Sequence, residues 1–162
     1  NDGLVGIVEE ADAQAARLEA LARHFDAARA RLAATPSRRP ATGWMTSRFG
    51  VRHDPMTGVR KMHQGIDVAS AIGTPIITPA DAVVAKVHEL SGYGLTVLLD
   101  HGFGIMTMYA HLADSRVKAG DRVRRGERIG SIGMSGRSTG PHLHYEVLVD
   151  GMPVDPERFI LD

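Results

Sequence analysis

Short strands separated by glycine and proline dominate the chain from Trp44 onward, and they restrict the fold more than any other feature. No helical period of useful length interrupts them. Regularly spaced short strands without intervening helices predict a mainly β domain over residues 44–162, built as an antiparallel sheet or a sandwich-like barrel. Loops such as Gly50–Lys61 would then carry function. The predicted strands are Trp44–Phe49, Pro75–Thr78, Ala82–His88, Leu95–Asp100, Gly104–Ala110, Arg128–Ile132 and His142–Val149.

Residues 4–34 follow a different pattern, rich in Ala, Leu, Arg and Glu, without proline and with glycine only at Gly6. Apolar residues recur at alternating steps of four and three, which is the heptad seam of an α-helix, interrupted only at Arg29. We therefore predict a helical arm over residues 1–34 and a linker over residues 35–43. Two interpretations stay open, a coiled-coil arm and an amphipathic helix that lies on its own domain. The seam consists of Leu4, Val8, Ala11, Ala15, Leu18, Ala22, Phe25 and Leu32.

Composition excludes several classes of function. Nineteen basic residues balance nineteen acidic residues, so the chain lacks the net attraction to phosphate that general nucleic-acid binding uses. The chain has no cysteine, which excludes a thiol nucleophile and leaves His and carboxylates as the ligands for any metal. No apolar run is long enough to span a bilayer. The chain opens with neither a methionine nor a signal sequence, so we expect a fragment whose export segment or membrane anchor lies outside it.

The segment Pro141–Val149 holds the strongest chemical signal. Proline suits the first residue of a strand, and apolar residues then alternate with His142, His144 and Glu146 in the period of a half-buried strand. Both histidines therefore point the same way, with attachment points roughly 6.6 Å apart. One imidazole of such a pair can bind a metal while the other faces whatever occupies that metal.

Two further elements carry candidate side chains. His63 and Asp67 are separated by Gly65 and by β-branched Ile66, which disfavour a helix, so a loop entering a strand must bring them together. His111 stands at the end of the strand that runs from Gly104. Each element alone is a weak signal.

Taken together, these motifs resemble the M23 family of zinc metallopeptidases, the lysostaphin-like or LytM-type domain that cuts peptidoglycan cross-bridges. The resemblance covers roughly residues 44–159, and it departs at Ala82 and Leu95, where a Gly and a polar residue are expected. It implies that the zinc ligands are His63, Asp67 and His144, and that His111 and His142 flank the open metal position. The matching motifs are Ser47–Arg52, His63–Asp67, Gly73–Pro75, Tyr109–Leu112 and Ser138–Glu146.

Two imidazoles and one carboxylate would leave zinc a residual positive charge and a fourth position for water, which the metal acidifies. His111 and His142 would then take the proton from water, hydrogen-bond the oxyanion or protonate the leaving amine, in a division that the sequence leaves open. Glu146 could orient a ligand histidine through its second nitrogen, but we expect it to face solvent.

The resemblance implies a zinc-dependent endopeptidase of peptidoglycan cross-links in the periplasm or outside the cell. An Ala- and Arg-rich arm favours a D-Ala–diaminopimelate cross-link over an oligoglycine bridge. The arm itself could self-associate, bind an envelope protein or lead to a membrane anchor. The main alternative is a catalytically silent LytM-like module that binds and activates another cell-wall hydrolase.

Two other metal enzymes fit the sequence less well. A non-haem iron triad usually places its carboxylate two residues after the first histidine, and it would not explain the close pair His142 and His144. A His-Glu-x-x-His protease is excluded because His88–Glu89 is followed by Leu90, Ser91 and Gly92, which leaves the second ligand missing.

Overall fold

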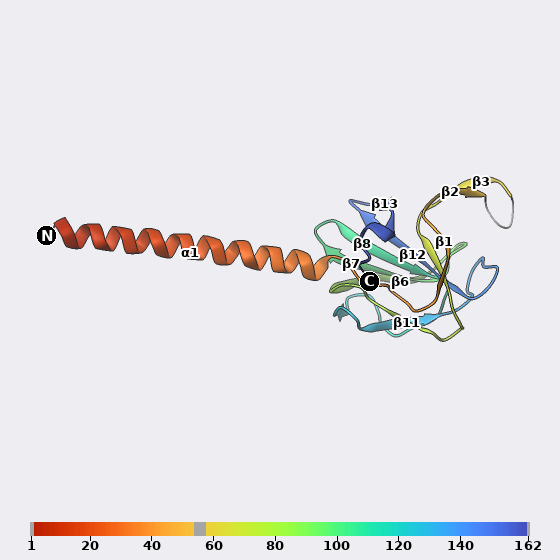
Figure 1. The fold of residues 1–162 in the computed structure, drawn as a ribbon. Helices are drawn as coiled ribbons and strands as arrows, with labels where there is room; N and C mark the ends of the chain where they lie inside the picture. Colours follow the sequence, from red (N-terminus) through yellow and green to blue (C-terminus); the bar gives the residue numbers. More distant parts are fainter. Residues whose placement is uncertain (1, 54–57, 162) are drawn as a thin grey trace. The chain divides into compact units, whose positions relative to one another are not determined.

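The computed structural model describes residues 2–53 and 58–161 and divides the chain into two compact units, residues 1–33 and 34–162. Helix α1 (Asp2–Ala34) accounts for the first unit and confirms the predicted helix (Figure 1). It ends at Ala34 because Thr35 precedes Pro36, and proline disfavours the helical conformation of the residue before it. No helix in the described part of the chain has the length and hydropathy needed to span a bilayer.

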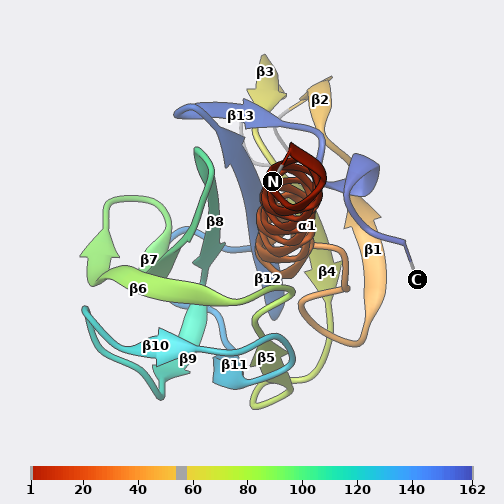
Figure 2. The ribbon, with the colours of Figure 1, turned by 90° about the vertical axis from the view of Figure 1, so that its left-hand side faces the viewer.

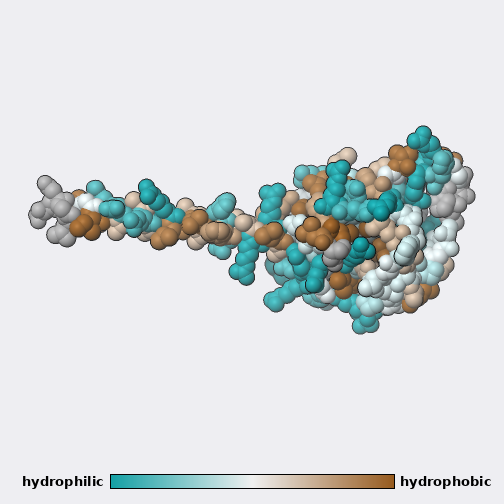
Figure 3. All heavy atoms as spheres, in the orientation of Figure 1, coloured by the Kyte–Doolittle hydropathy of each residue, from teal (hydrophilic) through white to brown (hydrophobic). Residues whose placement is uncertain are grey.

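A single helix cannot bury its own apolar stripe. Hydrophobic and hydrophilic side chains both lie along the surface of α1, and Leu18, Phe25 and Leu32 stay more than 60% exposed (Figure 3). The coiled-coil interpretation of this helix stays a prediction.

The second unit is mostly antiparallel β-structure, as the strand pattern predicted (Figure 2). The larger sheet of the described residues has the order β1-β4-β12-β8-β7-β6-β10, with β13 paired to β12, and a smaller sheet has the order β5-β11-β9. The larger sheet comprises β1 (Trp44–Ser47), β4 (Ile66–Ala69), β6 (Ala82–Leu90), β7 (Gly94–Gly102), β8 (Ile105–Ala110), β10 (Arg122–Val123), β12 (His142–Val149) and β13 (Met152–Val154). The smaller sheet comprises β5 (Pro75–Ile77), β9 (Leu112–Ser115) and β11 (Arg128–Ile132), and a 3-10 turn η1 follows at Pro156–Arg158.

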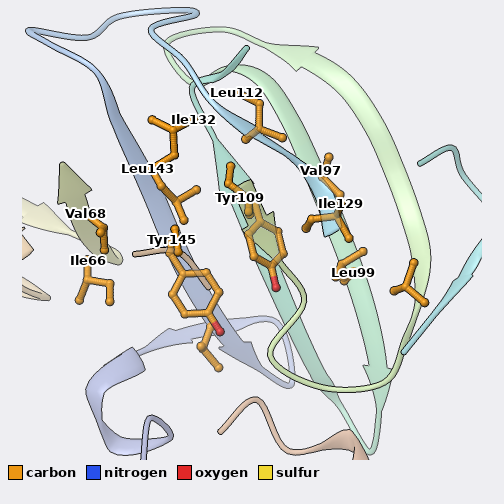
Figure 4. Packing of buried hydrophobic residues seen from close by; sticks show 14 of the residues in the cluster. Ile66, Val68, Val97, Leu99, Tyr109, Leu112, Ile129, Ile132, Leu143 and Tyr145 are labelled. Atoms are coloured by element: carbon orange, nitrogen blue, oxygen red, sulfur yellow. The ribbon is translucent and has the colours of Figure 1, made fainter. Parts of the chain in front are cut away.

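The hydrophobic core receives side chains from both sheets. Tyr109 of β8 and Tyr145 of β12 lie at its centre with ring centroids 5.3 Å apart, and both are fully buried (Figure 4). Ile76, Leu112 and Ile129 of the smaller sheet belong to the same core cluster. On each strand the residues that alternate with these apolar ones are free to build a site on the opposite face.

Residues 35–43 join the second unit through the backbone. The Ile77 amide donates to the Pro40 carbonyl over 2.8 Å, and Ala41 is buried in the core. This segment therefore packs as part of the β unit.

One expected loop is a hairpin instead. The segment Gly50–Lys61 was expected to be a loop, but β2 (Gly50–His53) pairs antiparallel with β3 (Arg60–His63). Short, exposed hairpin strands show no apolar alternation, so the sequence carries no signal for this hairpin. Residues 54–57, which connect the two strands, lie outside the described part of the chain.

Candidate metal centre and active site

Strands β12 and β4 place His144 and Asp67 side by side. Leu143, Tyr145 and Val147 of β12 enter the core, so His144 points to the opposite face. The antiparallel register pairs His144 directly with Asp67, where Cβ atoms of opposed residues lie about 4.5–5.5 Å apart. The alternation predicted from the sequence thus places His144 on the face where Asp67 of the adjacent strand also lies, and the two are candidate ligands.

His63 reaches the same point from the last residue of β3. Gly65 allows the β3–β4 connection to lie against β12, because a Cβ on Gly65 would come within 2.2 Å of the Tyr145 carbonyl oxygen. His63 Nε2 lies 3.1 Å from Asp67 Oδ1 and 3.1 Å from His144 Nδ1. The expected loop entering a strand is therefore a strand end and a tight connection.

The three converging atoms form a site for a cation. His63 Nδ1 donates to the Arg48 carbonyl over 2.8 Å, and His144 Nε2 donates to Glu146 Oε1 over 2.8 Å. In neutral imidazoles the remaining atoms, His63 Nε2 and His144 Nδ1, then carry lone pairs. Both lone pairs point at Asp67 Oδ1, and the His144 Nδ1–Oδ1 distance is 2.8 Å. Three electron-rich atoms at this separation repel one another unless a proton or a metal ion lies among them.

The pKa shifts describe the same electrostatics. Burial favours the neutral form of Asp67, but hydrogen bonds from His144 and His63 hold the pKa of this carboxyl well below its ordinary value. Burial also disfavours the charged form of His144, yet the hydrogen bonds to Asp67 and Glu146 outweigh it and raise its pKa to about 9. A protonated His144 thus supplies the missing positive charge when no metal is bound.

Two nitrogens and one carboxylate oxygen fit the ligand chemistry of zinc. Donor atoms of His63, Asp67 and His144 lie within 4.8 Å of one another, and all three residues are buried. Three ligands of this kind are typical of catalytic zinc sites, which keep a fourth position open.

His111 and His142 stand beside this cluster, with ring centroids 4.6 Å apart. His111 follows β8 in the left-handed conformation (φ 63°), which is uncommon for a residue with a side chain and frequent at functional sites. Its Nδ1 donates to the Ser135 carbonyl over 2.8 Å, and His142 Nδ1 donates to the Gly140 carbonyl over 2.9 Å. In neutral rings with these Nδ1 donors, the lone pair lies on Nε2. Burial, with the nearby imidazoles, lowers the pKa of His111.

Glu146 does not face solvent, contrary to our expectation. Its side chain is 3% exposed, and Oε1 accepts hydrogen bonds from both His144 Nε2 and the Tyr93 hydroxyl, the latter at 3.2 Å. The strand alternation had placed Glu146 on the same face as His144. Its burial was not predictable because the β6–β7 hairpin that carries Tyr93 covers this face only in the folded chain.

A groove of about 500 Å³ is lined by His63, Asp67, His111, His142 and His144. Its other lining residues include Tyr93, Ser138 and Thr139, together with three cationic side chains, Arg52, Lys61 and Arg137. Arg52 Nη2 lies 3.2 Å from the second oxygen of Asp67. The groove therefore carries more positive than negative charge around the candidate ligands.

The structure brings together all five residues selected from the sequence. Of the other histidines, His101 on β7 is a buried structural residue, hydrogen-bonded to the Asp81 carbonyl and to Thr107. Arg52 ends the matching motif Ser47–Arg52, but the sequence assigns it no role because its contact with Asp67 depends on the β2–β3 pairing. For Glu146 the sequence offers the orienting role only as an alternative to a solvent-facing position.

Sequence comparison identifies the family. Residues 61–156 match the sequence model of peptidase family M23. This range includes all five candidate site residues, His63, Asp67, His111, His142 and His144. The chain belongs to peptidase family M23. An uncharacterized metalloprotease of Haemophilus influenzae is 48% identical over 106 residues, which are 65% of this chain and 22% of the relative. The DD-carboxypeptidase/endopeptidase Mpg of Neisseria meningitidis is 45% identical over 112 residues, 69% of this chain and 26% of the relative.

Solved structures agree with this M23 assignment. The crystal structure of a zinc containing peptidase from Vibrio cholerae has a TM-score of 0.69 and 39% identity, covering 74% of this chain and 38% of that one. The chain thus spans about a quarter of the length of the curated relatives named above. Its M23 domain has the fold of zinc peptidases.

Proposed function

We propose that this M23 domain is a zinc-dependent endopeptidase that hydrolyses peptide cross-links of peptidoglycan, with D,D-type cross-links favoured. The observation that carries the proposal is the convergence of His63 Nε2, Asp67 Oδ1 and His144 Nδ1 in a groove that His111 and His142 also line. Several relatives are named peptidoglycan DD-endopeptidases, and one of them, ShyA of Vibrio cholerae, is 45% identical to this chain over 112 residues.

His63, Asp67 and His144 would hold the zinc ion. When bound, zinc would polarise the scissile carbonyl and make a water molecule acidic near neutral pH. Glu146 holds His144 in the tautomer that leaves Nδ1 as a lone pair, and the Arg48 carbonyl does the same for His63 Nε2.

His111 and His142 would do the proton work. Because the Nδ1 atoms donate to the Ser135 and Gly140 carbonyls, each neutral ring would have its lone pair on Nε2, and both residues line the groove. Such a nitrogen can take a proton from the attacking water and then give it to the leaving amine. Tyr93 lies parallel to the His111 ring, with an interplanar angle of 14°, and so restricts its orientation.

The test is digestion of purified cross-linked peptidoglycan by the zinc-loaded protein, with products identified by mass spectrometry. We expect cross-linked fragments to become monomers, and we expect no cleavage by chelator-treated protein. His144→Ala should lose zinc, whereas His111→Ala should keep zinc and lose about 10²–10⁴-fold in rate. His24→Ala removes a histidine of α1 and serves as the matched control.

Intact cross-links in the presence of stoichiometric zinc would contradict the peptidase assignment. They would support the alternative of a silent module that activates another hydrolase, which a mixing experiment with that hydrolase would detect. If zinc does not bind, the ligand assignment itself is wrong.

Location and self-association are finer proposals. Peptidoglycan lies outside the cytoplasm, so an enzyme acting on it would work in the periplasm or outside the cell. The heptad seam of α1 would form a coiled coil, and Phe25→Glu at an exposed seam position should then abolish self-association in sedimentation velocity experiments.

A further inference from the structure

Two cationic side chains, Arg52 and Lys61, line the groove beside the candidate metal ligands but are not ligands themselves. Arg52 lies on β2 and Lys61 on β3, and the hairpin register pairs them directly. Both side chains line the groove. Opposed residues of an antiparallel pair point to the same face, so the two cations stand side by side.

Among the described residues, Asp67 is the only carboxylate paired with either of these two cations. Arg52 contacts one oxygen of Asp67, whose other oxygen faces the two ligand histidines, and the Arg52 Nε atom has no hydrogen-bond partner among the described residues. Within residues 2–53 and 58–161 no carboxylate pairs with Lys61. Like charges at opposed positions are destabilising, and an anion bound between them relieves that repulsion.

The chemistry of the cross-link supplies such an anion. In a D-Ala–diaminopimelate cross-link the residue on the amine side of the scissile bond carries a free α-carboxylate, and so does the last residue of a D-Ala–D-Ala terminus. That carboxylate is separated from the scissile carbonyl carbon by the amide nitrogen and one carbon, so it lies within about 4 Å of the carbonyl. In an oligoglycine bridge the same position is another neutral peptide bond.

We propose that Arg52 and Lys61 bind the free α-carboxylate of the residue on the amine side of the scissile bond. The pair thus directs the site to bonds that end in an acidic leaving residue, in cross-links and in stem-peptide termini alike, and against neutral bridges. A guanidinium already 3.2 Å from a candidate zinc ligand is within reach of a carboxylate so close to the reacting carbonyl. This inference rests on the proposed peptidase function.

The experiment compares two synthetic stem peptides that end in D-Ala–D-Ala and differ only in a C-terminal carboxylate or carboxamide. For the zinc-loaded protein we expect kcat/KM to be about tenfold or more higher for the carboxylate, as charge-assisted hydrogen bonds imply. Lys61→Met and Arg52→Gln should each bring the ratio towards one. Lys86→Met removes an exposed lysine of β6 outside the groove and should leave the ratio unchanged.

Zinc content is measured for every variant, because Arg52 also touches Asp67. If Arg52 only positions Asp67, Arg52→Gln would lower kcat/KM equally for the two peptides and leave their ratio unchanged. That result would overturn the proposal. Equal cleavage of the two peptides by the unaltered protein would overturn it as well.

Binding gives an independent result. Calorimetric titration of zinc-loaded His111→Ala with each peptide should show about tenfold tighter binding of the carboxylate, and the preference should disappear when Lys61→Met is added. Preferential binding without cleavage by the unaltered protein would reject the peptidase function and keep the carboxylate site. Cleavage of peptidoglycan with no binding preference would support the peptidase function and reject the carboxylate site.

Discussion

Glu146 holds the candidate zinc ligand His144 through a hydrogen bond and is not itself a candidate ligand. Glu146→Ala would leave the buried His144 Nε2–H without its acceptor at 2.8 Å and free the imidazole to change tautomer. We expect zinc affinity to fall about 10–100-fold, as for other carboxylates that hold a ligand histidine. Competition with a chromophoric chelator measures this affinity.

Two variants separate the hydrogen bond from other effects of that change. Glu146→Gln keeps an oxygen acceptor and should lose less affinity, while Tyr93→Phe removes the other hydrogen bond to Glu146 and should change affinity by only a few-fold. Equal losses for Glu146→Ala and Tyr93→Phe would show that His144 does not depend on its acceptor.

His101 provides a pH dependence of stability that is separate from the site. Burial lowers the pKa of His101 below its ordinary value of 6.5, despite the hydrogen bond to the Asp81 carbonyl. Between the two pKa values the unfolded chain binds a proton that the folded chain does not, so stability decreases as pH falls below about 6.5. Urea unfolding of the zinc-loaded protein at several pH values between about 5 and 8 should show this decrease.

The control is His101→Gln, because a glutamine side chain at position 101 does not titrate in this range. Its unfolding free energy should change less between neutral and acidic pH than that of the unaltered protein. Parallel curves for the two proteins would rule out His101 as the source.

At the scale of elements, the β3–β4 connection determines whether His63 meets Asp67. Gly65→Ala would place a methyl group 2.2 Å from the Tyr145 carbonyl oxygen and 2.9 Å from Glu146 Cγ, in a region where backbone must move. We expect a loss of about 1–3 kcal/mol in unfolding free energy and weaker zinc binding. Urea unfolding and chelator competition measure the two effects.

Gly140→Ala is the matched control, because a Cβ there meets nothing within 4 Å. It should unfold like the unaltered protein. If Gly65→Ala does the same, the connection has more freedom than its contacts indicate.

At the scale of the whole molecule, the β unit has a hydrophobic core of its own. Among the described residues its core cluster runs from Ala41 to Val147 with flanking residues up to Ile160, and none of these residues lies on α1. A chain without residues 1–33 should therefore unfold cooperatively with an unchanged midpoint and bind zinc with unchanged affinity. Loss of cooperative unfolding in that variant would show that the helix supports the fold.

Local patterns determined the helix and the longer strands of this protein. A heptad seam without proline predicted the helix, and the alternation of Leu143, Tyr145 and Val147 with the histidines predicted β12 with its correct bounds. These features need only the period of a helix or strand and the cost of burying polar groups. The M23 resemblance then assigned roles to His63, Asp67, His111, His142 and His144.

Tertiary structure decided how those residues meet. The pairing of His144 with Asp67, the hairpin that carries Arg52 and the burial of Glu146 beneath Tyr93 all depend on strands far apart in the chain. Antiparallel register is set by the packing of one face against the core, which leaves no signature in the neighbouring residues. The sequence by itself therefore determined which side chains are available for chemistry, and only the sheet decided their distances, tautomers and charge environment.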